Sequence, residues 1–326
     1  MSCPDLLLAI ATLSIGLLIM PASSSFAEPL PEGEGIAASY PGDAGLMEHS
    51  SVVFVEDFES GKLDPVRWED VRGRENIDIV SDHVHSGGHA CRFTCDQQID
   101  DATAKTWFMP GHKTIFVRWY VWFDQAIMGT SHVFSTPTSN IIDEKWQHRA
   151  GGGAGHRPID SFWTTLEPVR KEGVPDPGVW GFYTYWPLMR SFQSDEGVGD
   201  TYYGNRFWPE PPVPVKPGRW ICMEVMLKSN TPGQSDGEQA CWVEGRLAAR
   251  FGPGVPNGHW TRDVFHNDPD GEPFEGYEWR SREDVLINMY TMGLYQGPKK
   301  DGKAEISRIW YDDIVVATEY VGPQAE

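Results

Sequence analysis

One stretch of the chain, from Arg219 to Phe251, limits the possible folds more than any other. Its first arm, Trp220 to Leu227, places apolar residues on both faces of an extended chain, which is typical of a strand inside a two-layer sandwich. The next residues, 230–237, are rich in Asn, Pro, Gly and Asp and favour turns. Ala240 to Val243 forms a second arm. The stretch therefore predicts a β-hairpin inside an all-β fold.

Strand patterns recur through the rest of the chain. The strongest lies at 115–123, where every residue except Arg118 is β-branched or aromatic and favours a strand. Two more strands are expected at 285–295 and 306–318. Between residues 124 and 217, short strand patterns alternate with Gly- and Pro-rich segments, which is typical of long loops on a sandwich scaffold.

The first fifty residues divide into two expected parts. Residues 1–27 contain an apolar run, Leu6 to Met20, followed by small residues, which predicts a signal peptide that is removed on export. The run is short for a membrane span, so the mature chain is expected to have none and to be secreted or periplasmic. Residues 28–50 are rich in Pro, Gly, Glu and Ala and are expected to be a linker, which leaves residues 51–323 as the folded domain.

The net charge and the cysteine pattern limit the partners, metal sites and disulfides that the chain is expected to have. The formal net charge is −20, which argues against nucleic acid as a partner and requires that any polyanionic substrate meet a local concentration of positive charge. Cys-x-x-Cys and His-Glu-x-x-His motifs are absent, so a zinc site is not expected. Cys222 and Cys241 lie on opposite arms of the hairpin, where they would either form a disulfide or serve as small buried side chains.

The hairpin carries the motifs of a known fold family. They read W-x-x-x-E from Trp220, K-x-N-T-P-G from Lys228, D-G-E from Asp236 and W-V-x-G-R-L from Trp242. These motifs resemble the concanavalin A-like jelly-roll of polysaccharide lyases, notably the alginate and glucuronan lyases, and of related uncharacterised secreted bacterial proteins. The resemblance covers roughly residues 52–323. It implies a jelly-roll β-sandwich of two antiparallel sheets with long loops.

The resemblance also implies a function. The expected activity is that of a secreted polysaccharide lyase, which cleaves a uronic-acid-containing glycan by β-elimination. The alternative is a non-catalytic carbohydrate-binding or cell-envelope protein on the same scaffold. The Glu-x-Asp-x-x-Glu motif of jelly-roll glycosidases and the Gly-x-Ser-x-Gly elbow of serine hydrolases are both absent, which makes hydrolysis a weaker candidate.

Two residue types are needed for β-elimination: a group that neutralises the substrate carboxylate and a base that removes the neighbouring proton. Arg118 is the candidate for the first role because an arginine in the middle of a strand needs an anionic partner. The alternative is an ion pair between Arg118 and Glu224. His132, at the start of a short strand pattern, is a candidate for the base.

A second catalytic candidate comes from the resemblance. The segment 288–297 is similar to the lyase strand that carries a glycine, an aliphatic residue, a tyrosine and an amide. This similarity implies that Tyr295 donates a proton and that Gln296 contacts the substrate. The lysine that often precedes the glycine in those lyases is absent, and Thr291 and Met292 stand there instead.

Aromatic and polar residues in the loop-rich middle of the chain are the candidates for substrate binding. Tyrosine and tryptophan rings pack on pyranose faces, while amide and guanidinium groups bind hydroxyl groups. The alternative is that the rings belong to the core. The expected substrate-binding residues are Arg157, Tyr183, Tyr185, Tyr203, Asn205, Trp208, Glu224 and Tyr290.

A structural calcium ion is also expected from the resemblance, whereas no organic cofactor is. Many carbohydrate-active jelly-rolls hold this ion where the first and last strands of the domain meet. Glu56, Ser86 and Asp313 are the candidate ligands, because calcium prefers carboxylate and hydroxyl oxygens. The alternative is that these residues are polar groups in solvated turns.

Overall fold

The computed structural model describes residues 28–96, 100–124, 131–140, 155–159, 161–297 and 306–325. The expected signal peptide, residues 1–27, lies outside these ranges, so export stays a prediction. Across the ranges just given, no helix has the length and apolar character needed to cross a membrane. The helices there are four short 3₁₀ turns: η1 (Ile36–Ser39), η2 (Pro41–Asp43), η3 (Leu46–Glu48) and η4 (Arg74–Asn76).

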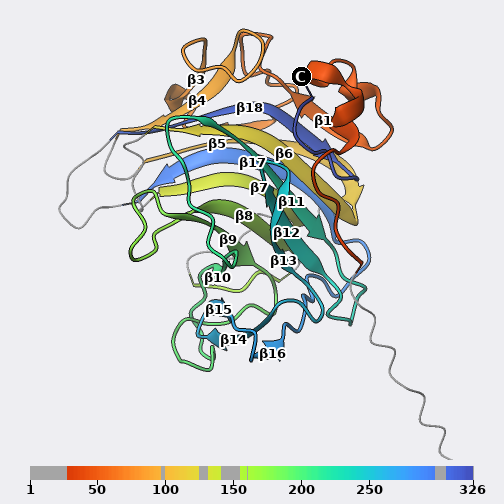
Figure 1. Cartoon of the computed structure of the whole chain (residues 1–326), viewed down its shortest axis with the longest axis vertical. Coiled ribbons are helices and arrows are strands. Elements are labelled where there is room, and N and C mark those ends of the chain that lie inside the picture. Colours follow the sequence, from red (N-terminus) through yellow and green to blue (C-terminus); the bar gives the residue numbers. More distant parts are fainter. Residues whose placement is uncertain are drawn as a thin grey trace, which may run out of the picture.

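Two β-sheets packed face to face make up the fold (Figure 1). Sheet A has the strand order β13-β12-β11-β6-β18-β4-β3, and β1 also pairs with β18. Its strands are β1 (Val52–Glu56), β3 (Ile77–Val80), β4 (Ala90–Cys95), β6 (Thr114–Phe123), β11 (Trp220–Lys228), β12 (Glu238–Val243), β13 (Arg246–Phe251) and β18 (Ser307–Ala317). All pairs in this sheet are antiparallel.

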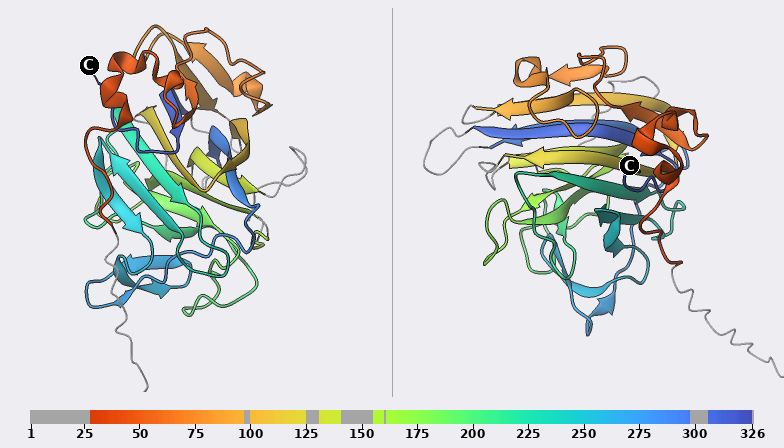
Figure 2. Two further views of the ribbon diagram at one scale, coloured as in Figure 1. Left: turned by 90° about the vertical axis from the view of Figure 1, so that its right-hand side faces the viewer. Right: turned by 45° about the horizontal axis from the view of Figure 1, so that its top comes forward.

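Sheet B is the larger of the two and has the order β16-β14-β15-β10-β9-β8-β7-β17-β5-β2. Its strands are β2 (Asp70–Arg72), β5 (Asp100–His112), β7 (Ser131–Asn140), β8 (Ser161–Val169), β9 (Val179–Tyr185), β10 (Asn205–Phe207), β14 (Asn257–Thr261), β15 (Val264–Asn267), β16 (Glu272–Pro273) and β17 (Leu286–Gln296). The pairing is antiparallel except between β10 and β15. The small strands β14 to β16 lie together at one end of the molecule (Figures 1 and 2).

The sandwich confirms the all-β jelly-roll prediction and the β-hairpin in particular. β11 pairs with β12 across the turn-rich loop and with β6 on its other side, so the first arm of the hairpin is an inner strand. Alternate residues of β6 and β11, among them Trp119, Val121, Met223 and Val225, are fully buried in the core between the sheets. The side chains between them point away from the core on what we call the outer face of sheet A.

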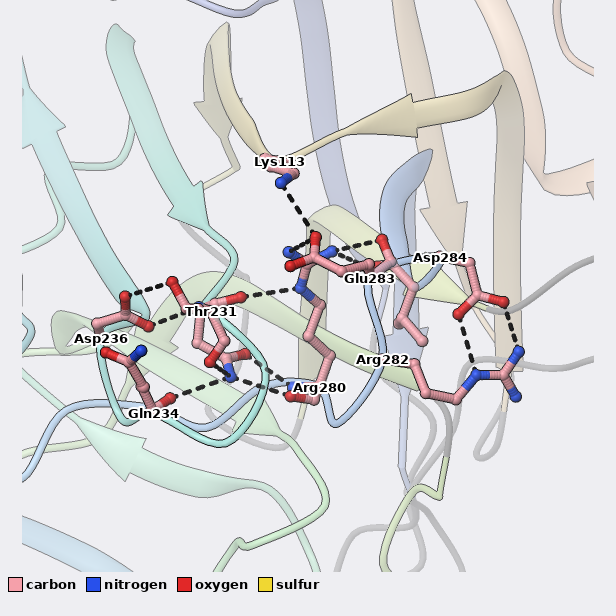
Figure 3. A network of polar contacts seen from close by, with 10 residues as sticks. Lys113, Thr231, Gln234, Asp236, Arg280, Arg282, Glu283 and Asp284 are labelled. Atoms are coloured by element: carbon pink, nitrogen blue, oxygen red, sulfur yellow. Dashed lines mark hydrogen bonds and ion pairs between the residues drawn. The ribbon is translucent and has the colours of Figure 1, made fainter.

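The loop at 230–237 is fixed to the segment that precedes β17 (Figure 3). The side-chain amide of Asn230 donates to the carbonyls of Thr231, Gln234 and Arg280 at 2.9, 3.0 and 2.9 Å. In return, the backbone N–H of Arg280 donates to the Asn230 side-chain oxygen at 2.9 Å. The buried Arg280 guanidinium donates to the carbonyl of Val285 at 2.9 Å. Each polar group that this loop buries therefore has a partner, which is what makes its burial tolerable.

The segment expected to be a linker, residues 28–50, is packed against the outer face of sheet A. Ala37 and Leu46 are fully buried in a small apolar cluster with Val315, Ala317 and Val321. The backbone N–H of Ala37 donates to the carbonyl of Val321 at 2.9 Å. Figure 1 shows this segment, in red, beside the C-terminus. Residues 28–50 are therefore not a free spacer, because they bury apolar side chains and bond to the C-terminal segment.

The cysteines of the described chain are free thiols. Cys91, Cys95, Cys222 and Cys241 are all buried and unbridged. On the hairpin, the register partner of Cys241 is Val225 rather than Cys222. The small-buried-residue alternative is therefore confirmed, and the disulfide alternative is wrong.

Candidate functional site

Five polar side chains meet on the open face of sheet B, the face turned away from the core. They are His132 on β7, Glu167 on β8, Tyr183 on β9, Arg206 on β10 and Tyr295 on β17. Each is next in sequence to a buried core residue, respectively Val133, Leu166, Phe182, Phe207 and Leu294. Because successive side chains of a strand point to opposite faces, all five point away from the core.

The strand register places these side chains side by side. Tyr295 is directly opposite His132 in the β17–β7 pair, and Arg206 is directly opposite Tyr183 in the β10–β9 pair. β8 lies between β7 and β9 and brings Glu167 beside His132. Five neighbouring strands therefore contribute one functional group each to a single cluster.

His132 and Glu167 form the centre of the cluster. The His132 Nδ1 atom lies 3.0 and 2.9 Å from the two carboxylate oxygens of Glu167. The Glu167 side chain is only 3% exposed, whereas that of His132 is 30% exposed. A proton on Nδ1 that is donated to Glu167 leaves Nε2 with a free lone pair. The pair therefore holds the imidazole in one orientation with its other nitrogen available.

The charge of Glu167 sets the acidity of His132. Burial disfavours the charged imidazole, but the attraction and hydrogen bond of the Glu167 carboxylate outweigh it and raise the pKa of His132, against a smaller opposing effect of Arg206. A cation close to a histidine disfavours its protonated form. The Arg206 guanidinium lies 5.5 Å from the centroid of the Tyr183 ring, and that ring lies 5.1 Å from the His132 ring, so Arg206 shares the site with His132.

Two tyrosines flank the histidine. The ring centroids of Tyr183 and Tyr295 lie 5.1 and 5.9 Å from that of His132. The Tyr183 hydroxyl is hydrogen-bonded to the Tyr185 hydroxyl at 3.2 Å, and burial raises the pKa of Tyr183. A Cβ atom on Gly204 would lie 2.6 Å from the Tyr183 ring, so only glycine allows this close approach. Tyr183 is therefore fixed on both sides and stays protonated.

Further aromatic groups extend the cluster along sheet B. The Trp163 ring stacks on Tyr185 with centroids 4.5 Å apart. The guanidinium of Arg157 lies 4.4 Å above the Tyr202 ring, and the neighbouring Tyr203 is 45% exposed. Exposed or half-buried rings beside hydrogen-bonding groups are the usual composition of a sugar-binding surface.

The structure thus gathers several of the residues expected from the sequence. His132 and Tyr295, both expected catalytic residues, are neighbours, and Tyr183 lies beside them. Tyr185 is hydrogen-bonded to Tyr183, but it is only 3% exposed and belongs to the core cluster, so it supports Tyr183 and its expected contact with a substrate does not fit its position. Arg157 and Tyr203 flank the segment that leads into β10. Trp208 is half-buried just after β10, where its carbonyl accepts a hydrogen bond from the Asn267 side chain at 3.4 Å.

Arg118 and Glu224 require a correction, because they lie on the other sheet. They are cross-strand neighbours in the β6–β11 pair of sheet A. The Arg118 side chain is 0% exposed and forms its ion pair with Asp43 of the N-terminal segment. Glu224 is buried and accepts hydrogen bonds from the backbone N–H groups of Val321 and Gly322 at 2.7 and 2.9 Å. Neither side chain is accessible to a substrate.

Three other expected contact residues are also buried, so their expected roles at a substrate do not fit their positions. Gln296 is 0% exposed and accepts a hydrogen bond from the Ser307 hydroxyl at 2.7 Å. The side chain of Asn205 is committed to the backbone of Arg190 through two hydrogen bonds of 2.7 Å. Tyr290 belongs to the core cluster. In each case the side chain points to the core side of its strand, where strand alternation puts it.

Sequence reasoning missed Glu167 and Arg206 as site residues. Glu167 lies at the end of a short strand pattern whose other residues are mostly uncharged, and a single acid there gives no sign of its partner. Arg206 lies between the expected contact residues Tyr203 and Trp208, where the sequence favours its neighbour Asn205 as the polar contact. The signal that distinguishes Arg206 from Asn205 is strand alternation: Phe207 is apolar and points to the core, so Arg206 points outward and Asn205 points inward.

The expected calcium ligands have other partners. The Asp313 carboxylate accepts a hydrogen bond from Ser86 at 2.9 Å and lies 2.6 Å from His85 Nδ1. Glu56 accepts hydrogen bonds from the Trp68 indole at 2.9 Å and from Arg67 at 3.1 Å. Within the described ranges, no group of three or more His, Cys, Asp or Glu residues is arranged to hold a metal. Each of the three residues therefore has protein partners in this structure, and calcium binding by them stays a prediction.

Comparisons with known proteins identify the fold. No protein-family model and no curated protein matches the sequence. Among solved structures, an alginate lyase from a Chlorella virus is similar with a TM-score of 0.54 and 14% identity, over 82% of this chain and 99% of that one. A marine alginate lyase from Aplysia kurodai gives 0.54 and 12%, over 82% and 100%. An alginate lyase mutant in complex with alginate tetrasaccharide gives 0.50 and 14%, over 91% and 100%.

These similarities confirm the jelly-roll part of the resemblance. At 12–14% identity they show a shared fold, and one fold hosts many functions. An argument for function must therefore come from the cluster on sheet B.

Proposed function

We propose that this protein is a polysaccharide lyase that cleaves a uronic-acid-containing glycan by β-elimination. The observation that carries the proposal is the His132–Glu167 pair, which lies between Tyr183 and Tyr295 on the open face of sheet B. Arg206 supplies a cation at the same place. The similar solved structures are of alginate lyases, which makes a uronate polymer the first substrate to test.

The chemistry assigns one step to each group. The Nε2 atom of His132 removes the proton on C5 of the uronate, and the electrons of that bond form a double bond between C4 and C5. The bond between C4 and the glycosidic oxygen breaks, and Tyr295 donates its hydroxyl proton to the leaving oxygen. Arg206 pairs with the uronate carboxylate, which lowers the charge that develops when the C5 proton leaves.

Glu167 acts through His132 as a positioning residue. Its hydrogen bond at Nδ1 fixes the tautomer in which Nε2 is the base, and its charge stabilises the imidazolium that forms when the proton is taken. The raised pKa of His132 implies that the base becomes available as the pH rises above the usual histidine range. Activity is therefore expected to increase from slightly acidic to slightly alkaline pH.

The site also meets the condition that the acidic sequence imposes on a polyanionic substrate. The chain as a whole has a formal charge of −20, yet Arg206 and Arg157 both lie over tyrosine rings at this end of sheet B. Cations held over aromatic faces are positioned to pair with carboxylates along a chain of uronates.

The test is the ultraviolet absorbance of the unsaturated uronate ends, which only β-elimination creates. The wild type is incubated with alginate, glucuronan and related uronate polymers, beside His132→Ala, Tyr295→Phe and, as a matched control, His259→Ala. His259 is an exposed histidine on β14, at the end of sheet B. We expect His132→Ala to lower the rate by about 10²- to 10⁴-fold, the usual contribution of a general base, and His259→Ala to leave it unchanged. A flat trace for the folded wild type on every polymer would refute the proposal.

A second candidate is a non-catalytic glycan-binding protein on the same scaffold. One observation favours it: the strand position that often holds a lysine in the lyases is occupied by Thr291 and Met292. Lys105 of β5 lies opposite Thr291, but it is paired with Asp70 at 2.8 Å. A protein that retains uronate oligosaccharides in affinity electrophoresis while its absorbance trace stays flat would support this candidate.

A further inference from the structure

Three tryptophans form a row across the outer face of sheet A. Trp220 of β11 is directly opposite Trp122 of β6, and Trp122 is directly opposite Trp310 of β18. The residues beside them in sequence, including Ile221, Val121 and Ile309, belong to the core, so the indole rings point outward. Since neighbouring strands are about 4.8 Å apart, the row spans about 10 Å.

The row continues into charged residues on the next two strands. Trp310 is opposite Arg92 of β4, and Arg92 is opposite Asp78 of β3. Arg92 is paired with Asp78 at 2.9 Å and with Asp82 at 3.3 Å. Five neighbouring strands of sheet A therefore carry one row of outward side chains, with tryptophan rings on three strands and ion-paired charges on the other two.

A loop after β3 covers one end of the tryptophan row and shapes a pocket there. The His83 ring stacks on Trp310 with centroids 4.7 Å apart and meets Trp122 edge-on at 4.8 Å. Asp82 accepts a hydrogen bond from the Trp310 indole at 3.1 Å. The resulting cavity has a volume of about 500 Å³, a usual size for a small-ligand site. Its lining includes Trp122, Trp310, Asp78, Asp82, Arg92 and Thr94.

This half of the outer face is left open where the other half is covered. The row that contains Phe116, Met226 and Ala240 is buried with Leu30 and Tyr320 from the two terminal segments. Trp122 and Trp220 remain half-buried. Trp310 is only 4% exposed, because the His83 ring stacks on it. The chain thus covers its outward apolar residues at one end of sheet A and leaves Trp122 and Trp220 partly accessible at the other.

The chemistry of the pocket selects a neutral sugar. Indole rings pack on the apolar faces of pyranose rings, and fixed carboxylate and guanidinium groups bind hydroxyl pairs. Five acids and two arginines line the cavity, which gives a formal charge of −3 from 2 − 5 with His83 neutral. A chain of uronates would be repelled by this charge, whereas a neutral glycan would not.

We propose that the pocket around Trp122 is a second carbohydrate-binding site, which binds a chain of neutral pyranose sugars. It lies on sheet A, so the core of the sandwich separates it from the His132 cluster on sheet B. It requires no catalysis and does not depend on the proposed lyase activity. The protein would hold a neutral polysaccharide on one side while the other side meets a uronate.

The test is isothermal titration calorimetry of the full chain with neutral β-linked oligosaccharides, namely gluco-, manno- and xylo-hexaoses, and with alginate oligosaccharides for comparison. We expect the wild type to bind at least one neutral hexaose, with an affinity that changes little with salt. Trp122→Ala should weaken that binding about tenfold, since the stacking of one aromatic ring contributes about 1.4 kcal/mol. Trp122→Phe, which keeps a ring, should bind within a few-fold of the wild type.

Two controls keep the result interpretable. Thr94→Trp fills the cavity from β4 without removing a tryptophan, so it should abolish binding even if Trp122→Ala folds poorly. His132→Ala should bind neutral hexaoses like the wild type, because it alters the opposite face. The proposal is overturned if no neutral hexaose binds, if Trp122→Ala and Thr94→Trp bind neutral hexaoses as tightly as the wild type, or if these two variants weaken the binding of alginate oligosaccharides more than that of neutral hexaoses.

Discussion

The buried ion pair between Arg118 and Asp43 yields a sharp prediction, because it decides whether Arg118 serves the fold or a substrate. The Arg118 side chain is 0% exposed and that of Asp43 is 8% exposed. Asp43 has a φ of 57°, a conformation that asparagine adopts readily. Asp43→Asn therefore removes the negative charge without disturbing the backbone, and leaves the Arg118 guanidinium buried without its carboxylate.

The structure sets the size of the effect. Breaking a buried ion pair from one side typically costs about 3–5 kcal/mol. Glu224 lies opposite Arg118 on the next strand and supplies part of the missing negative charge, so we expect the lower end, about 3 kcal/mol. Arg118→Met in the Asp43→Asn background removes the unpaired charge while keeping the length of the side chain. The double variant should therefore be about 2 kcal/mol more stable than Asp43→Asn alone.

Urea unfolding, followed by tryptophan fluorescence at fixed pH, measures all four proteins of this cycle. The structural role of the pair is refuted if Asp43→Asn stays within about 1 kcal/mol of the wild type, or if the double variant is no more stable than the single one. If a folded Arg118→Met protein lost uronate turnover, Arg118 would have to be assigned a role at the substrate.

Three further predictions test the site and the buried acids. Glu167→Gln removes the charge that raises the pKa of His132, so the acid limb of the pH–rate profile should move to lower pH as the rate falls; an unmoved limb would contradict a positioning role. Gly204→Ala places a Cβ atom 2.6 Å from the Tyr183 ring, so the ring must move; steady-state kinetics should show a higher KM, and the urea midpoint should fall because such overpacking costs about 1–3 kcal/mol. Burial raises the pKa of Glu224 to about 7 from 4.5. The unfolded chain then loses this proton at a lower pH than the folded chain does. The free energy of unfolding of the wild type, compared with that of Glu224→Gln, should therefore fall by roughly 3 kcal/mol as the pH rises from about 4.5 to about 7.

Local alternation explains which strands could be predicted from the sequence. The strands expected at 285–295 and 306–318 correspond to β17 at Leu286–Gln296 and β18 at Ser307–Ala317, because large apolar residues mark their inward positions. β5, at Asp100–His112, lacks a comparable series of large apolar residues at its inward positions. Its inward residues include Ala102 and Ala104, whose side chains are too small to give a clear hydrophobic period. The strand is held by its pairing with β17 along most of its length, which no local pattern records.

The site was harder to predict for a related reason: alternation shows which side of a strand is outward but not to which sheet the strand belongs. Arg118 and Tyr295 both point away from the core, yet β6 is in sheet A and β17 is in sheet B. Glu167 and His132 are 35 residues apart in the chain, and only the packing of β7 beside β8 brings them together. A charge on the outward side of a strand is therefore a candidate for the site only once the sheet is known. On sheet A the outward charge of Arg118 is covered by the N-terminal segment and paired with Asp43. On sheet B the outward charge of Glu167 is paired with His132, and the histidine is the member of the pair that stays 30% exposed.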